Sequence, residues 1–148
     1  MKFTIERSTW RCGCLNINLT RRNGEGLTKL LNREGFRCCL GSVCSQLGVP
    51  DDKLLDIEYP SSGHLSDFPI DILRTRNPFG LGIENTQLAQ DAININDSSA
   101  LLTDKEAQLI ELFAKHGHQL EFVGNFANDK SDVGAEDKSS CSTQSTPD

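Results

Sequence analysis

The stretch TDKEAQLIELFAKHGHQLEF, residues 103–122, decides the fold because it predicts a helix followed directly by a strand. Thr103 and Glu106 have the spacing of a capping box, in which each side chain accepts from the backbone N–H of the other residue. The helix should end at Gly117. Its apolar side chains recur at helical spacing and are expected to face inward: Leu109, Ile110, Phe113 and Ala114. Residues 119–123 then alternate between apolar and polar, which predicts a strand.

The first residues of the chain carry a second strand signal. Phe3 and Ile5 alternate with polar residues across 2–7, which is typical of a half-buried strand. Trp10 follows and is expected to be a large core side chain. Strands at the two ends of a domain often pair, so we expect a small sheet that brings both ends together. Near Leu27–Leu31 the chain should form another strand.

A helix is predicted over 38–47, between the two terminal strands. Its apolar stripe consists of Leu40, Val43, Cys44 and Leu47. Gly48 and Pro50 are residues that commonly follow the end of a helix. Residues 50–55 can form one further helical turn, with acidic side chains near its beginning.

A third helix is expected to begin at Asn85 or Thr86 and to end before Asn96-Asp97-Ser98-Ser99. Its inner face consists of Leu88, Ala89, Ala92, Ile93 and Ile95. The segment 56–83 is interpreted as an irregular connection with one short strand near Ile70–Leu73.

These patterns predict the α+β class: a small sheet that includes the N-terminal and C-terminal strands, about three helices on one face, and a disordered C-terminal tail. Residues 1–126 are expected to form a single α+β domain. Residues 127–148 are polar, acidic and without an apolar period, and should be disordered. No stretch approaches the roughly 18 apolar residues of a membrane span. The chain becomes charged within its first seven residues, so a signal peptide is not expected.

Charge is unevenly distributed along the 148 residues, whose formal net charge is −6. Residues 1–37 carry eight Lys/Arg and three Asp/Glu, whereas 38–126 carry five basic and thirteen acidic residues. An acidic protein is poorly suited to long duplex nucleic acid, because neutralisation of phosphates dominates that affinity. The early arginines suit a small phosphate or carboxylate: Arg7, Arg11, Arg21, Arg22, Arg33 and Arg37. The alternative is that this basic segment folds against the acidic remainder.

The six cysteines allow three interpretations: Cys12, Cys14, Cys38, Cys39, Cys44 and Cys141. Cys39 near a helix N-terminus could be a nucleophile, with His64, Asn96 or Asp97 as partners. Two pairs, Cys12-x-Cys14 and Cys38-Cys39, could hold zinc, although neither has the usual spacing of about two to four residues between ligands. The third interpretation is that the doublet consists of small buried hydrophobes. We expect no metal and no cofactor.

Several runs of the sequence resemble a family of small uncharacterised proteins of tailed-phage genomes and prophages, which carry a Cys-Cys-Leu-Gly motif after a strand and a turn. The resemblance covers roughly residues 1–124 and is carried by MKFTIERSTWRCG (1–13), LLNREGFRCCLG (30–41), NIND (94–97), LFAKHG (112–117) and LEFV (120–123). This chain has a longer, more basic insertion around 14–24. The family implies no catalytic residues. It implies an accessory protein that binds a host enzyme or a host signalling molecule, in the cytoplasm of an infected bacterium.

The resulting hypothesis is a phage-encoded accessory protein that antagonises a host defence process by non-catalytic binding and sequesters a small anionic, nucleotide-like signal. The expected ligand-binding residues are Trp10, Arg11, Arg33, Phe36, Arg37, Cys38 and Cys39. The alternatives are an inhibitor that binds a host protein directly, a Cys-dependent hydrolase or transferase, and a zinc-stabilised interaction module. The expected partners exclude membranes and long nucleic acid and include a second copy of the chain.

Overall fold

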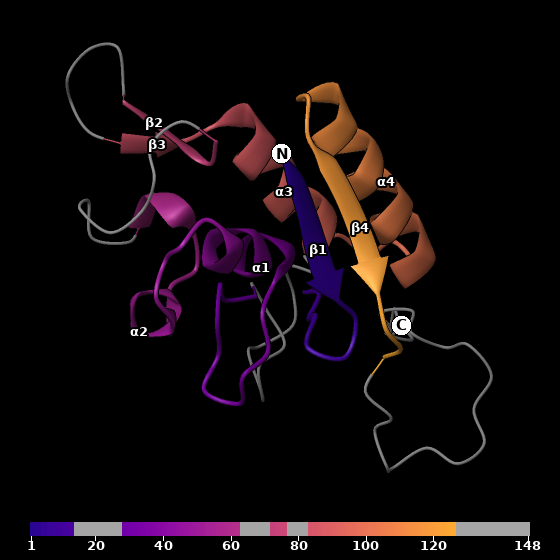
Figure 1. Ribbon diagram of the computed structural model, residues 1–148, viewed down its shortest axis with the longest axis horizontal. Helices are drawn as coiled ribbons and strands as arrows, with labels where there is room; N and C mark the ends of the chain where they lie inside the picture. Colours follow the sequence, from indigo (N-terminus) through magenta and orange to yellow (C-terminus); the bar gives the residue numbers. More distant parts are fainter. Residues whose placement is uncertain (14–27, 63–71, 77–82, 127–148) are drawn as a thin grey trace, which may run out of the picture.

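The computed structural model describes four segments of the chain, residues 1–13, 28–62, 72–76 and 83–126. They form the expected α+β fold, in which strands from the two ends of the described chain pair and helices pack against them (Figure 1). The predicted tail over 127–148 and the basic insertion around 14–24 lie outside the described residues. No helix in the described segments is long and apolar enough to span a membrane.

The sheet consists of β1 (Lys2–Glu6) and β4 (Gln119–Val123), which run parallel with Phe3 opposite Leu120. Both strands have the predicted bounds to within one residue. A parallel pair needs a long crossover connection, and here the rest of the domain supplies it. The two ends of the fold are therefore held side by side, as the alternating patterns predicted.

The described residues include four α-helices: α1 (Cys39–Gln46), α2 (Asp51–Leu54), α3 (Gln87–Asn96) and α4 (Leu102–Lys115). A short 3-10 helix, η1 (Pro60–Ser62), precedes the small antiparallel pair of β2 (Arg74–Arg76) and β3 (Ile83–Asn85). Helix α1 contacts β1 and α3, and α4 contacts β4 and α3. The three longer helices thus form one layer beside the sheet (Figure 1).

The caps of α1 and α3 follow from local sequence. Cys38 is the N-cap of α1, and its Sγ accepts from the Gly41 N–H at 3.4 Å. The predicted Thr86 cap of α3 is confirmed, because Thr86 Oγ1 accepts from the Ala89 N–H at 3.2 Å. Gly48 follows α1 with a φ of 90°, a left-handed conformation that glycine adopts at little cost.

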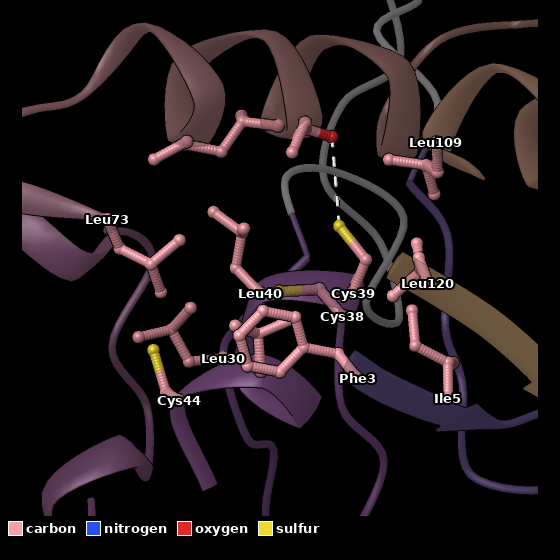
Figure 2. Close-up of a cluster of buried hydrophobic side chains, with 14 of the residues drawn as sticks. Phe3, Ile5, Leu30, Cys38, Cys39, Leu40, Cys44, Leu73, Leu109 and Leu120 are labelled. Carbon is pink, nitrogen blue, oxygen red and sulfur yellow. Dashed lines mark hydrogen bonds between the residues drawn. The ribbon is translucent and has the colours of Figure 1, made fainter. Parts of the chain in front are cut away.

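The core lies between the sheet and the three longer helices. Phe3 packs edge-on against Phe113 of α4, with ring centroids 6.0 Å apart. Figure 2 shows Cys39 and Leu40 of α1 among these apolar side chains, with the Cys39 thiol directed at a carbonyl of α3. Both residues have no exposed surface. The interpretation of the doublet as small buried hydrophobes is therefore the one that matches the packing.

The predicted start of α4 is wrong. The helix begins at Leu102, its N-cap Leu101 makes no side-chain cap bond, and the Leu101 carbonyl accepts from the Lys105 N–H at 2.9 Å. The Glu106 carboxylate is not in a capping box, because Arg7 donates to both of its oxygens at 2.8 Å. A long-range ion pair thus replaces the local cap that the spacing suggested.

The predicted inner face of α4 is correct for Leu109 and Phe113 but wrong for two residues. Ile110 is 41% exposed and Ala114 is exposed as well, whereas Lys105 and Leu112 are buried. Helix α4 packs against α3 as well as against β4, so Leu112 and Lys105, which donates to the Asn96 carbonyl of α3, are buried as well.

The predicted strand at Leu27–Leu31 is not formed by its described part. Leu31 makes one isolated bridge with Leu55, and the Leu30 N–H donates to the Ile57 carbonyl at 2.7 Å. Residues 70 and 71 of the strand expected near Ile70–Leu73 lie outside the described residues. β2 begins at Arg74, and the Leu73 carbonyl accepts from the Thr86 N–H at 3.0 Å, one position beyond the paired residues of β2 and β3.

Candidate functional site

The seven residues predicted to bind a ligand divide into a buried group and a surface group. Trp10, Cys38 and Cys39 are at most 5% exposed, so they contribute to the core and cannot contact a ligand as the molecule stands. The surface group consists of Arg11, Arg33, Phe36 and Arg37. The turn between Leu31 and α1 positions most of this group.

Arg33 and Arg37 pair with acidic side chains of later segments, as Arg7 does with Glu106. Arg37 Nη2 lies 2.6 Å from Asp51 Oδ1 at the start of α2. Arg33 Nε lies 2.9 Å from Asp56 Oδ2, and Lys29 Nζ approaches the other oxygen at 2.7 Å. Hydrogen bonds from these two cations lower the pKa of Asp56. At these positions the basic segment folds against the acidic remainder, which was the alternative to an anion site.

Arg11 differs from those arginines. Its side chain is exposed, and its Cζ lies 3.8 Å from the ring centroid of Phe36. The Arg11 N–H donates to the Arg37 carbonyl at 2.8 Å, which fixes the backbone beneath the stack. In the described part of the chain, no acidic side chain forms a salt bridge with it. We call the surface formed by Arg11, Phe36, Arg37 and Arg33 the Arg11 face.

Two of the hollows on the described surface are lined without an arginine. One, of about 330 Å³, is lined by Asp91, Asn94, Ile95, Gln108, Glu111, Leu112 and Lys115. The other, of about 320 Å³, is lined by Lys2, Ile110, Ala114, His118, Gln119, Leu120 and Glu121. The Arg11 face contributes to neither of these hollows.

Burial disfavours the thiolate form of the described cysteines. Burial raises the pKa of Cys12 and Cys38 to about 12 and the pKa of Cys39 well above its ordinary value. The Cys39 Sγ–H donates to the Ala92 carbonyl at 3.8 Å. A nucleophilic cysteine needs a lowered pKa and an adjacent base, and neither is found at the described positions of the doublet.

The structure also bears on the partners proposed for these thiols. His64 and Cys14 lie outside the described residues. Among the described side chains, no cluster of three or more His, Cys, Asp or Glu has the arrangement to hold a metal ion. The described cysteines therefore provide packing and a helix cap.

Sequence reasoning missed a buried polar cluster centred on Asn96. Its Oδ1 accepts from Trp10 Nε1–H at 2.9 Å and from the Cys39 N–H at 3.3 Å. Its Nδ2 donates to Thr28 Oγ1 at 2.8 Å and to Asp97 Oδ1 at 2.9 Å. Asn96 thus joins the end of α3 to the segment after β1 and to the beginning of α1.

Asp97 and Lys105 complete this cluster. Asp97 Oδ1 accepts from the Gly13 N–H at 3.1 Å and from Thr28 Oγ1 at 2.8 Å. Lys105 Nζ donates to the carbonyls of Gly13 and Asn96 at 3.0 and 3.1 Å. Burial raises the pKa of Asp97 and lowers the pKa of Lys105, since it disfavours the charged form of each.

The cluster holds segments of the protein together, because its polar atoms bond the protein's own backbone and side chains. Asn96-Asp97 was interpreted as a helix break and as a possible partner of a nucleophilic Cys39, and Lys105 only as part of a capping box. The sequence contains only a weak signal for this cluster. That signal is a polar pair at the end of an amphipathic helix, together with a tryptophan whose N–H needs a partner when buried.

In comparisons with known proteins, no family model, no curated protein and no solved structure matches this chain.

Proposed function

We propose that this chain is a non-catalytic binding protein that engages an acidic group on a host protein through the Arg11 face. The observation that carries the proposal is the exposed Arg11 guanidinium, stacked on Phe36 without an acidic partner among the described residues. A stacked guanidinium keeps its edge N–H donors directed outward, and these suit a carboxylate or phosphate. The resemblance to phage accessory proteins supports a role against a host process in the cytoplasm of an infected bacterium.

The state of the cysteines supports binding over catalysis. Cys39, the residue that a Cys-dependent hydrolase or transferase would use, is fully buried and hydrogen-bonded to a carbonyl of α3. Its thiol pKa is raised by burial, so the thiolate is scarce at neutral pH. The titratable groups of the Asn96 cluster are likewise bonded within the protein.

The Arg11 face contributes to neither of the two hollows described above, which supports a protein surface over the small nucleotide-like signal as its partner. Sites for small ligands are concave and surround most of the ligand. Arg33 and Arg37 are each bonded to an aspartate, which leaves Arg11 as the exposed cation of this face that lacks an acidic partner among the described residues. A protein partner can supply a carboxylate to Arg11 and pack beside the half-buried Phe36 ring.

The test uses tagged full-length protein expressed in a bacterial host. Arg11→Ala should lose a host protein that co-purifies with the wild-type chain in stoichiometric amount, because its guanidinium supplies the contact. Lys115→Ala removes one exposed cation from α4 and is the matched control, which should retain the partner. Equal recovery with both variants would refute the role of Arg11.

Two further measurements separate the alternatives. Calorimetric titration with nucleotides should show no heat; saturable binding that depends on Arg11 would instead favour the sequestration of a small anionic signal. Alkylation of the native protein at neutral pH should label Cys39 slowly, since its thiol is buried. Fast and selective labelling of Cys39 would favour the Cys-dependent enzyme.

A further inference from the structure

Two aspartates accompany the arginines that flank Arg11 on the Arg11 face. Asp51 Oδ1 lies 2.6 Å from Arg37 Nη2, and Asp56 Oδ2 lies 2.9 Å from Arg33 Nε. Both carboxylates reach the solvent, since the side chains of Asp51 and Asp56 are 62% and 33% exposed. An anion that approaches either arginine therefore meets a negative charge beside it.

The backbone holds Asp56 in a conformation that side chains rarely adopt. Its φ is 61°, in the left-handed region, and the Asp56 N–H donates to the Leu31 carbonyl at 2.9 Å. Its Oδ1 accepts from Lys29 Nζ at 2.7 Å, so this one aspartate pairs with two cations. A rare conformation that the surrounding structure maintains points to a role for the side chain that it places.

The charge balance around the face depends on these two aspartates. Residues 28–62 carry four Lys/Arg and five Asp/Glu. With Asp51 and Asp56 made neutral, the cations of this segment would outnumber its acids. The affinity of a protein for nucleic acid rises with the number of phosphates that its cations neutralise. The two aspartates therefore lower the affinity of this surface for a run of phosphates.

We propose that Asp51 and Asp56 are specificity-determining residues of the Arg11 face, which exclude nucleic acid and other polyanions and leave the face to an isolated carboxylate of a partner. This inference rests on the proposed function, because it concerns the same face. Specificity commonly requires groups that repel the wrong partner as well as groups that attract the right one. An isolated carboxylate needs Arg11, whereas a run of phosphates must also contact the two arginines beside the aspartates.

The first experiment measures the binding of a short fluorescein-labelled oligothymidylate at low salt by fluorescence anisotropy. The wild-type chain should bind it weakly. Asp51→Asn/Asp56→Asn, the double variant, should lower the Kd about fivefold or more, because Arg33 and Arg37 become available to phosphates. Asparagine enters the left-handed region as readily as aspartate does, so the substitution at position 56 preserves the backbone.

The matched control is Asp104→Asn/Glu111→Gln. It removes two negative charges from exposed positions of α4 and frees Lys115, whose Nζ lies 3.0 Å from Glu111 Oε1. Its Kd for the oligomer should stay close to that of the wild-type chain. Addition of Arg33→Ala and Arg37→Ala to the double variant should remove the gain. Far-UV circular dichroism verifies that each variant is folded.

The salt dependence provides an independent readout. Each phosphate contact of a single strand contributes about 0.7 to the slope of log Kd against log salt, so the slope of the double variant should increase by about 1.4. A loss of local structure without new phosphate contacts would not increase this slope. If the double variant does not fold, Asp51→Asn alone keeps the test, with about half of that increase.

The proposal is overturned if the wild-type chain binds the oligomer as tightly as the double variant, or if the double variant and the matched control gain affinity equally. Failure of the proposed function is a separate result, in which Arg11→Ala retains the host protein whatever the oligomer does. If Arg11→Ala loses the host protein while the double variant gains no affinity for the oligomer, the proposed function stands and the role of the two aspartates is refuted.

Discussion

At the scale of single residues, the Asn96 side chain joins segments of the described structure that lie far apart in sequence. One side-chain oxygen accepts from Trp10 Nε1–H and from the Cys39 N–H, while the amide nitrogen donates to three acceptors, including Arg11 O at 3.3 Å. These partners belong to segments about 57 and 85 residues away in sequence. A buried amide of this kind is expensive to remove, because its partners lose their bonds without gaining water.

We expect Asn96→Ala to lower the free energy of unfolding by about 3 kcal/mol, since it leaves two buried donors unsatisfied. Urea denaturation followed by Trp10 fluorescence would measure the loss. Asn94→Ala changes an exposed asparagine of the same helix and should cost less than about 1 kcal/mol. Similar costs for the two variants would show that the Asn96 cluster is dispensable.

His118 differs from the simple expectation for a histidine after a helix C-terminus, where a cation is favoured. Its ring lies 5.9 Å from Phe3, centroid to centroid. Burial, together with the Met1 amine and His116, lowers its pKa below the ordinary value of 6.5. The fold therefore prefers the neutral imidazole.

This shift predicts a loss of stability in mild acid. As pH falls through about 6.5, the unfolded chain takes up the His118 proton first, so the free energy of unfolding decreases until the folded form is protonated too. Denaturant melts at pH 7.5 and pH 5.5 would measure the decrease, and His118→Gln should reduce it. A pH dependence unchanged by His118→Gln would assign the effect to other groups.

At the scale of elements, α1 owes its position to a glycine. A Cβ on Gly41 would lie 1.7 Å from the Leu30 carbonyl oxygen, so α1 and the segment before it approach more closely than any side chain allows. In a free helix, replacing glycine by alanine stabilises by about 1 kcal/mol. Here the tertiary contact reverses the sign of that effect.

Gly41→Ala should therefore destabilise the protein by about 3 kcal/mol or more, at the upper end of overpacking costs. Thermal melting gives the measurement. Gly48→Ala is the control, because no atom lies within 4 Å of its added Cβ; strain at its positive φ should cost only about 1–2 kcal/mol. A stabilised Gly41→Ala protein would contradict the close approach.

At the scale of the whole molecule, the pairing of β1 with β4 closes the domain. Further contacts join the same two segments, including the stacking of Trp10 on Phe126 at 6.4 Å and the ion pair of Arg7 with Glu106. Contacts of such large sequence separation form late and make folding cooperative.

Truncation tests this closure. A chain that ends at Phe126 should unfold cooperatively with nearly the wild-type Tm, because the described contacts remain. A chain that ends at His118 lacks β4 and should lose the cooperative transition, since Phe3 and Ile5 would be uncovered. Circular dichroism melts of both chains would show whether each has a cooperative unfolding transition. A folded protein ending at His118 would contradict the role of the strand pair.

Local periodicity predicted β1, α1, α3, α4 and β4, and the tendency of terminal strands to pair predicted the sheet. Periodicity works because an amphipathic pattern reports which side of an element is buried, as in α3 and β1. It does not report that α1 is buried almost all round, from Cys39 to Cys44.

Only the tertiary structure decided how the polar groups are used. The Glu106 carboxylate accepts from Arg7 and does not form the predicted helix cap. Cys39 of the doublet lies buried against α3. Asn96 becomes the centre of a buried cluster through partners far away in the chain. Hydrogen bonds and ion pairs join specific atoms at short range, so the choice among many equivalent partners depends on coordinates and not on residue type or spacing.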